Sequence, residues 1–77
     1  MALTLVLNGQ SRLFATLPET ATLADLVQEL GLKADRVAVE HNGEIAAKSV
    51  WSQTLLTDGD RLEVVHFVGG GSLLVLY

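Results

Sequence analysis

The sequence contains no cysteine, one proline and few aromatic residues: two phenylalanines, one tryptophan and one tyrosine. A chain without cysteine forms no disulfide, no thiolate zinc site and no cysteine nucleophile, so its stability has to come from packing. Hydrophobic residues make up 49% of the chain, which is typical of a folded domain and not of a disordered one. With 77 residues there is room for one small domain.

Positive charge is scarce as well. Five Lys and Arg residues stand against nine Asp and Glu residues, so the net charge is 5 − 9 = −4. This balance argues against nucleic acid or an anionic membrane as a partner, because both favour a basic face, and it permits a partner with a basic patch. No apolar run approaches the roughly 20 residues that span a bilayer. The N-terminus lacks the basic region and cleavage site of a signal peptide, so we expect a cytoplasmic protein.

The first 17 residues predict a β-hairpin. Asn8-Gly9 favours a two-residue type I′ turn, in which both central positions need positive φ. Apolar residues alternate before and after this turn at the period of a strand: Leu3, Leu5 and Leu7, then Leu13, Ala15 and Leu17. Pro18 ends the second strand.

An amphipathic helix is expected over about residues 22–30. Thr22 and Asp25 have the spacing of a capping box, with aspartate in place of the usual Glu or Gln. Gly31 is placed to end the helix in a left-handed conformation. Between them one apolar stripe follows the helical pattern: Leu23, Leu26, Val27 and Leu30. With a single helix, this stripe has to lie against a sheet.

The second half of the chain predicts further strands. Asn42-Gly43 marks a second turn, with Val37 and Val39 before it and Ile45 after it. Residues 48–56, "KSVWSQTLL", fit either a short helical turn or a brief edge strand, and Trp51 fits either a partly buried anchor or an exposed interface residue. Residues 58–60 predict a turn before the last strand. In that strand one face holds Leu62, Val64, His66 and Val68, and the other holds Arg61, Glu63, Val65 and Phe67.

This order of elements predicts an α+β domain. We expect a mixed sheet of four or five strands with one main helix packed on one face, and the helix stripe buried with Leu3, Val37 and Val64. The domain is placed at residues 1–68. Residues 69–77 are expected to form a flexible tail, with three glycines followed by an apolar extension.

The sequence offers little for catalysis or metal binding. His41 and His66 are far apart, and such histidines are more often surface or interface residues than catalysts. Asp58 and Asp60 have the spacing of a turn, and a metal ion would need further oxygen ligands. The glycines are followed by neither the helix nor the Lys-Ser/Thr pair of a phosphate loop. A chain this short also has little room for a substrate pocket, so we expect no enzyme and no bound metal.

Three glycines, Gly69, Gly70 and Gly71, follow the last predicted strand. Glycine costs backbone entropy there and packs nothing. One interpretation is a flexible tether. The other is a functional end, because a backbone without Cβ can thread a narrow channel and a terminal glycine carboxylate is unhindered toward an ATP phosphate. Spacing alone leaves both interpretations open.

Two stretches, "VAVEHNGEI" and "LLTDGDRLEVVHFVGGG", resemble the ThiS family of bacterial sulfur carriers in thiamine biosynthesis. The resemblance extends over residues 1–71 and implies a ubiquitin-like β-grasp fold, in which the last strand runs beside the first. In this family an E1-like enzyme uses ATP to adenylate the terminal glycine carboxylate. A sulfur-transfer system converts it to a thiocarboxylate, which donates sulfur to thiazole synthase for the thiazole ring.

By this resemblance Gly70 and Gly71 form the glycine end, and Gly71 carries the thiocarboxylate. Val65 and Phe67 share a face of the last strand, and with Gly69 they are expected to contact the activating enzyme. The resemblance implies no cofactor bound to the carrier, since ATP is used by the activating enzyme.

The chain departs from the family after Gly71, where it continues with residues 72–77, "SLLVLY". A glycine in a peptide bond has no free carboxylate to adenylate. Three explanations stay open: a protease trims the tail, the tail stems from cloning or a shifted reading frame, or the protein keeps only the fold and is an interaction module with an inert C-terminus. A carrier for another route, to molybdopterin, cysteine or another metabolite, is a further alternative. The tail is rich in strand formers and can pair with a sheet edge or with another copy.

Overall fold

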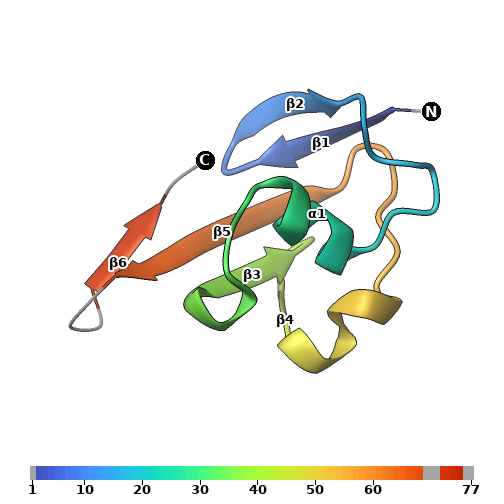
Figure 1. Ribbon diagram of the computed structural model, residues 1–77. Helices are drawn as coiled ribbons and strands as arrows, with labels where there is room; N and C mark the ends of the chain where they lie inside the picture. The colour runs from blue at the N-terminus through green and yellow to red at the C-terminus, as the bar shows by residue number, and fades with distance from the viewer. Residues whose placement is uncertain (1, 69–71, 76–77) are drawn as a thin grey trace.

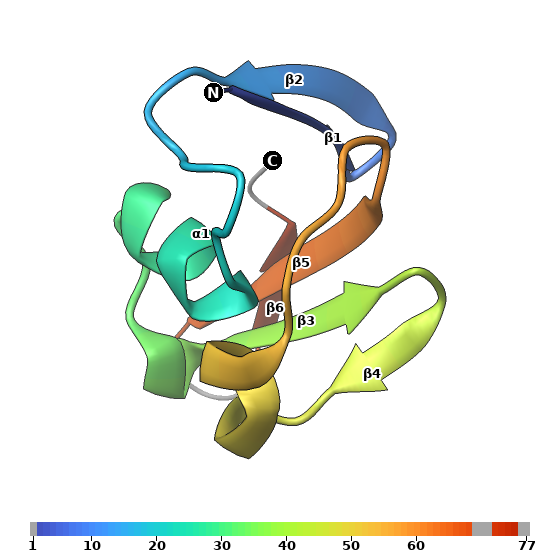
Figure 2. The same cartoon turned by 90° about the vertical axis from the view of Figure 1, so that its right-hand side faces the viewer.

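The computed structural model describes residues 2–68 and 72–75, which form one mixed sheet with a single main helix on one face (Figures 1 and 2). The strands are β1 (Leu3–Leu7), β2 (Gln10–Phe14), β3 (Val37–His41), β4 (Glu44–Ala46), β5 (Arg61–Val68) and β6 (Ser72–Val75). The main helix is α1 (Leu23–Glu29), and two short 3₁₀ helices are η1 (Ala34–Arg36) and η2 (Lys48–Gln53). The predicted α+β architecture of the ubiquitin-like β-grasp type is confirmed.

The strand order in the sheet is β2-β1-β5-β3-β4, and β6 pairs with β5 outside this path. β1 and β5 run parallel, with Leu7 beside Leu62, and the other strand pairs are antiparallel. The first strand therefore lies beside β5, as the family resemblance implies. Four or five strands were predicted. Five strands form the path, and β6 is a sixth strand among the described residues.

The first hairpin turns at Asn8-Gly9, where φ is 48° and 83°. Positive φ at both positions is what a type I′ turn requires, so this local prediction is confirmed. The two-residue turn places Phe14 opposite Leu3, and opposite residues of antiparallel strands share a face. Phe14 is therefore buried in the core, whereas Leu13 is 65% exposed on the other face. The alternation predicted through Leu13, Ala15 and Leu17 is wrong by one residue within β2, because turn length sets the register. The strand also ends at Phe14 and not at Pro18, and Leu17 is buried beyond its end.

Both ends of α1 are capped as predicted. The Thr22 hydroxyl accepts the Asp25 N–H at 3.3 Å, and the Asp25 carboxylate accepts the Thr22 N–H at 2.9 Å. At the other end Gly31 has φ of 74°, and the Leu32 N–H donates to the Val27 carbonyl at 3.2 Å, which is the closing bond of a Schellman motif. Within the described part of the chain, no helix is long and apolar enough to cross a membrane.

The core lies between α1 and the sheet. Leu23, Leu26 and Val27 of the predicted stripe are buried, and Leu30 is partly buried against them. The strands contribute a matching set of buried residues: Leu3, Leu5, Leu7, Phe14, Val37, Val39, Leu62 and Val64. The predicted partners of the helix stripe, Leu3, Val37 and Val64, are therefore confirmed.

The ambiguous segment before the last turn forms the 3₁₀ helix η2. Trp51 is buried, and its Nε1–H donates to the Ala46 carbonyl at 2.8 Å. A buried indole needs a partner for its one N–H group, and here β4 supplies it. Of the two interpretations of Trp51, the structural anchor is the one observed.

The sheet continues past the predicted domain boundary at Val68. β6 lies beside the end of β5 (Figure 1), with Val65 opposite Val75 and Val68 opposite Ser72. Ser72–Val75 thus lies in the sheet and not in a free tail, because a segment rich in strand formers meets an unpaired strand edge in its own chain. Residues 69–71 and 76–77 lie outside the described residues.

Candidate functional site

β5 divides its side chains between two faces, as predicted. Leu62 and Val64 are buried beneath α1, whereas Val65 is half-buried and Phe67 is 38% exposed on the other side of the sheet. The two residues predicted to contact a partner, Val65 and Phe67, therefore share one accessible surface close to the end of the domain. We call this surface the open face and define it by Ala38, Glu40, Ile45, Glu63, Val65 and Phe67.

The open face contains a shallow, largely apolar hollow of about 130 Å³. Ala38 lies opposite Val65 across the β3–β5 pairing and forms part of the wall of the hollow. Ile45 of β4 adds an apolar rim and is 83% exposed. Small-molecule sites are typically about 300–1,000 Å³, so this hollow suits a side chain of another protein better than a metabolite.

Two carboxylates meet at this hollow. Glu40 of β3 and Glu63 of β5 are direct partners in the antiparallel pairing, and both are exposed. Like charges directly opposite one another are unfavourable in a sheet. A basic group of a partner would relieve this repulsion, so the open face is complementary to a surface that is apolar and carries a positive charge.

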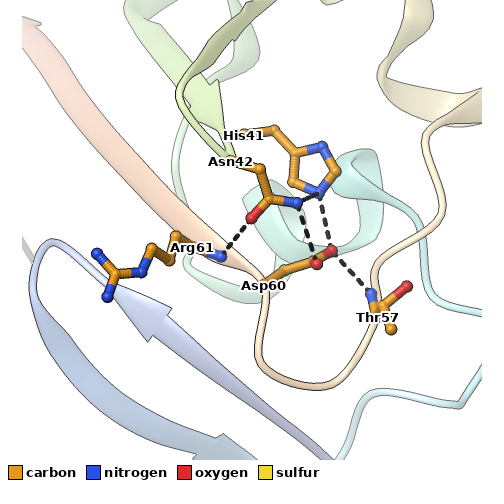
Figure 3. Close-up of polar contacts among 5 residues, drawn as sticks. All are labelled: His41, Asn42, Thr57, Asp60 and Arg61. Carbon is orange, nitrogen blue, oxygen red and sulfur yellow. Dashed lines mark hydrogen bonds and ion pairs between the residues drawn. The ribbon is translucent and has the colours of Figure 1, made fainter.

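A second polar feature joins the β3–β4 turn to the start of β5 (Figure 3). The Asp60 carboxylate bonds to His41 Nε2 at 2.8 Å and accepts the Asn42 Nδ2–H at 3.1 Å and the Thr57 N–H at 2.9 Å. The side chain of Asn42 in turn accepts the Arg61 N–H at 2.9 Å. Two of these contacts satisfy backbone N–H groups, those of Thr57 and Arg61, and the other two hold the side chains of His41 and Asn42 against Asp60. We therefore interpret the cluster as structural.

The same contacts change the acidity of Asp60. Burial raises the pKa of its carboxyl, but the hydrogen bonds from His41, from the Thr57 N–H and from Asn42 outweigh burial, so the pKa lies below its ordinary value. Three donors on one carboxylate leave little room for an added ligand. Within residues 2–68 and 72–75, no group of three His, Asp or Glu side chains is arranged to hold a metal ion.

We expect Asp60→Asn to flatten the acid side of the stability curve. A carboxyl whose folded pKa is depressed stabilises the fold above its unfolded pKa of about 3.9, and this contribution is lost as pH falls through the folded pKa. The free energy of unfolding of the native chain should therefore fall more between pH 5 and pH 3 than that of Asp60→Asn. Urea denaturation at both pH values measures this, with Glu19→Gln as the control at an exposed carboxylate. Equal losses in Asp60→Asn and the native chain would contradict it.

The predicted glycine end, Gly69, Gly70 and Gly71, lies outside the described residues. The structure places the strands on both sides of it: β5 ends at Val68, and β6 begins at Ser72. These two residues are opposite one another in the β5–β6 pairing. Val65 and Phe67 are thus brought next to the segment that contains the glycines, while their roles remain predictions.

Comparison with known proteins identifies the family. The model of the ThiS family matches residues 5–71, which include the three glycines and end before Ser72. The chain belongs to the ThiS family. A sulfur carrier protein ThiS of Bacillus subtilis (strain 168) is 43% identical to it over 53 residues, which cover 69% of this chain and 80% of that protein.

A solved structure supports the same fold for this ThiS-family chain. The crystal structure of the thiamine biosynthesis protein (ThiS) from Geobacter metallireducens has a TM-score of 0.75 at 31% identity. The matched region covers 90% of this chain and 100% of the Geobacter chain.

A thiazole synthase of Paramagnetospirillum magneticum (strain ATCC 700264 / AMB-1) is 47% identical over 68 residues, or 88% of this chain. The chain spans 20% of the length of that synthase and 15% of that of the thiazole synthase of Magnetococcus marinus (strain ATCC BAA-1437 / JCM 17883 / MC-1).

Sequence reasoning missed part of the open face of this ThiS-family chain. Ala38, Glu40 and Ile45 were not expected beside Val65. The alternation of β3 puts Ala38 and Glu40 on the face opposite Val37 and Val39, so the sequence was sufficient to predict which face of β3 they occupy. The sequence was not sufficient to predict the register between β3 and β5, because this register joins residues that are far apart in the chain.

Proposed function

We propose that this chain is a sulfur carrier for thiamine biosynthesis and that Gly71 is the residue that carries the sulfur. The extent of the family match, which includes the three glycines and stops at residue 71, is the observation that supports this most. The glycines directly follow β5, which is the central strand of the sheet path. A rigid strand therefore precedes the reacting end.

The chemistry takes place at the carbonyl carbon of Gly71. A carboxylate oxygen attacks the α-phosphorus of ATP, the bond to pyrophosphate breaks, and an acyl adenylate forms. A hydrosulfide equivalent from a sulfur donor then attacks the acyl carbon and displaces AMP, which leaves a thiocarboxylate. No side chain of the carrier takes part in these steps, so catalysis belongs to the enzymes that act on it.

This chemistry requires a free carboxylate at Gly71. In the 77-residue chain that carbon is joined to the nitrogen of Ser72 by an amide bond. Hydrolysis of this bond by a protease would release residues 72–77 and leave the carboxylate. We therefore place a processing step before activation.

Two kinds of partner follow from the proposal. An E1-like adenylating enzyme would activate Gly71, and thiazole synthase would accept the sulfur. The similarity to a region of the Paramagnetospirillum magneticum thiazole synthase supports the second partner. Loading the carrier with radioactive sulfur and adding thiazole synthase tests the route, since label that stays on the carrier would contradict it and favour another pathway.

The open face is the surface that we assign to the E1-like enzyme. It lies on the side of the sheet that α1 does not cover, and its members Val65 and Phe67 come directly before the glycines in the chain. Its apolar hollow and the facing carboxylates Glu40 and Glu63 suit an apolar surface with a basic group. Docking there would leave the end of the chain free to enter the active site.

Phe67→Ala in a chain ending at Gly71 should weaken activation without unfolding the domain. Loss of a partly exposed aromatic contact from an interface should raise the KM of the E1-like enzyme for the carrier roughly tenfold. The measurement is ATP–pyrophosphate exchange at varied carrier concentration, together with thermal unfolding. Leu55→Ala is the control, because Leu55 is an exposed apolar residue outside the open face. An unfolded Phe67→Ala would assign this ring to the core, and an unchanged KM would remove it from the interface.

A further inference from the structure

One edge of β5 is covered in turn by three parts of the chain: β1, the Asn8 side chain and β6. Its other edge is paired with β3 from Leu62 to His66. On the edge of interest, β1 pairs only with the beginning of β5, where the Val6 N–H donates to the Asp60 carbonyl at 2.9 Å and the Asn8 N–H donates to the Leu62 carbonyl at 2.8 Å. The backbone groups of even-numbered residues therefore point to this edge.

The Asn8 side chain covers the next position on this edge. Its Oδ1 accepts the Val64 N–H at 2.8 Å, and its Nδ2–H donates to the Val64 carbonyl at 3.1 Å. The side-chain amide thus replaces one residue of a neighbouring strand. The chain turns back at Asn8-Gly9, so β1 itself goes no further along β5.

Beyond Val64 the same edge is covered by β6. His66 lies opposite Leu74, and Val68 lies opposite Ser72. By the two-residue period of a strand, the N–H and C=O groups of His66 and Val68 point to the edge that Asn8 occupies at Val64. Without β6 these groups would form an open edge, which is a template for a strand of another chain.

We propose that the edge at residues 65–68 of β5 is a strand-addition site for an extended, apolar segment of a partner protein, and that Ser72–Val75 occupies it in cis. The structure already seats an antiparallel strand there. Main-chain hydrogen bonds give such sites their affinity, and neighbouring pockets give them specificity. The exposed ring of Phe67 and the half-buried Val65 lie on the adjoining open face and can supply those contacts.

The cis strand has a concentration advantage over any partner. Only three residues, 69–71, connect β5 to β6, and a short connection gives a high effective concentration of the tethered segment. A partner strand therefore competes poorly until residues 72–77 are removed. If processing occurs as proposed above, the same cleavage frees the carboxylate and opens this edge, although the edge itself does not depend on sulfur chemistry.

Hydrogen exchange of the 77-residue chain tests whether β6 covers the edge. Leu74→Pro should disrupt the pairing, because proline has no N–H and is poorly tolerated within a strand. The backbone amides of His66 and Val68 should then exchange roughly tenfold faster. The Val64 amide, held by Asn8, is the internal reference, and Leu74→Val is the matched control that keeps the N–H group. Unchanged exchange at both amides would overturn the proposal.

A peptide tests whether the edge accepts a strand in trans. The chain ending at Gly71 is mixed with a synthetic peptide of residues 72–77 that carries a lysine tag for solubility, and amide shifts and exchange are followed by NMR. We expect saturable shifts, renewed protection of His66 and Val68, and no binding to the 77-residue chain. The same peptide with proline at position 74 should not bind. No saturable shifts, or equal binding by both chain lengths, would overturn the proposal; neither ATP nor any enzyme is present, so these outcomes do not bear on the carrier function.

Discussion

A chain ending at Gly71 should support ATP–pyrophosphate exchange by an E1-like enzyme from the same organism, and the 77-residue chain should support none. Exchange requires a carboxylate oxygen that attacks the α-phosphorus of ATP. In the longer chain the acyl carbon of Gly71 carries the Ser72 nitrogen instead, and an amide offers no such nucleophile at that carbon. Both lengths contain all of β1 to β5 and α1, so a difference between them reports on the end of the chain.

Two controls accompany this measurement. Gly71→Ala in the shorter chain should slow exchange, because the added Cβ enters a channel that is expected to be narrow. The mass of the 77-residue chain after the reaction shows whether its tail is intact. Equal exchange by an intact long chain would contradict the processing step. No exchange by either length would contradict the carrier function and favour an interaction module with an inert C-terminus.

Leu26→Ala should remove much of the stability of the domain. Leu26 is 0% exposed and packs in the core between α1 and the sheet. Truncation of a buried leucine removes its transfer free energy and leaves a cavity, which together cost about 2–5 kcal/mol. Native domains are stable by about 5–15 kcal/mol, so urea denaturation should show a large shift of the midpoint.

Leu55→Ala is the matched control, because it makes the same chemical change at a residue that is 62% exposed. Surface substitutions usually change the free energy of unfolding by less than about 0.5 kcal/mol. These two variants test the packing of the core and not the carrier function, because the carrier function predicts no difference between them beyond the difference in stability. A Leu26→Ala loss as small as that of Leu55→Ala would place Leu26 outside the core and contradict the packing of α1.

The sequence by itself determined the local features of this protein. The turn at Asn8-Gly9, the cap formed by Thr22 and Asp25, and the helix end at Gly31 each depend on residues a few positions apart. Short-range sterics and hydrogen bonds decide such features, so residue types and spacing were sufficient. The buried face of α1 followed from its period, and the family resemblance followed from the motifs around the last turn and the glycines.

Only the tertiary structure decided what meets across the sheet. The Asn8 amide bonds to Val64, 56 positions away, and Glu40 faces Glu63. The burial of Phe14 and the pairing of β6 with β5 depend on register in the same way. An alternating segment can turn either of its faces to the core and can pair with any free edge, because its period is the same in each case. Turn length and core packing remove that ambiguity, and both act only once distant segments are in contact.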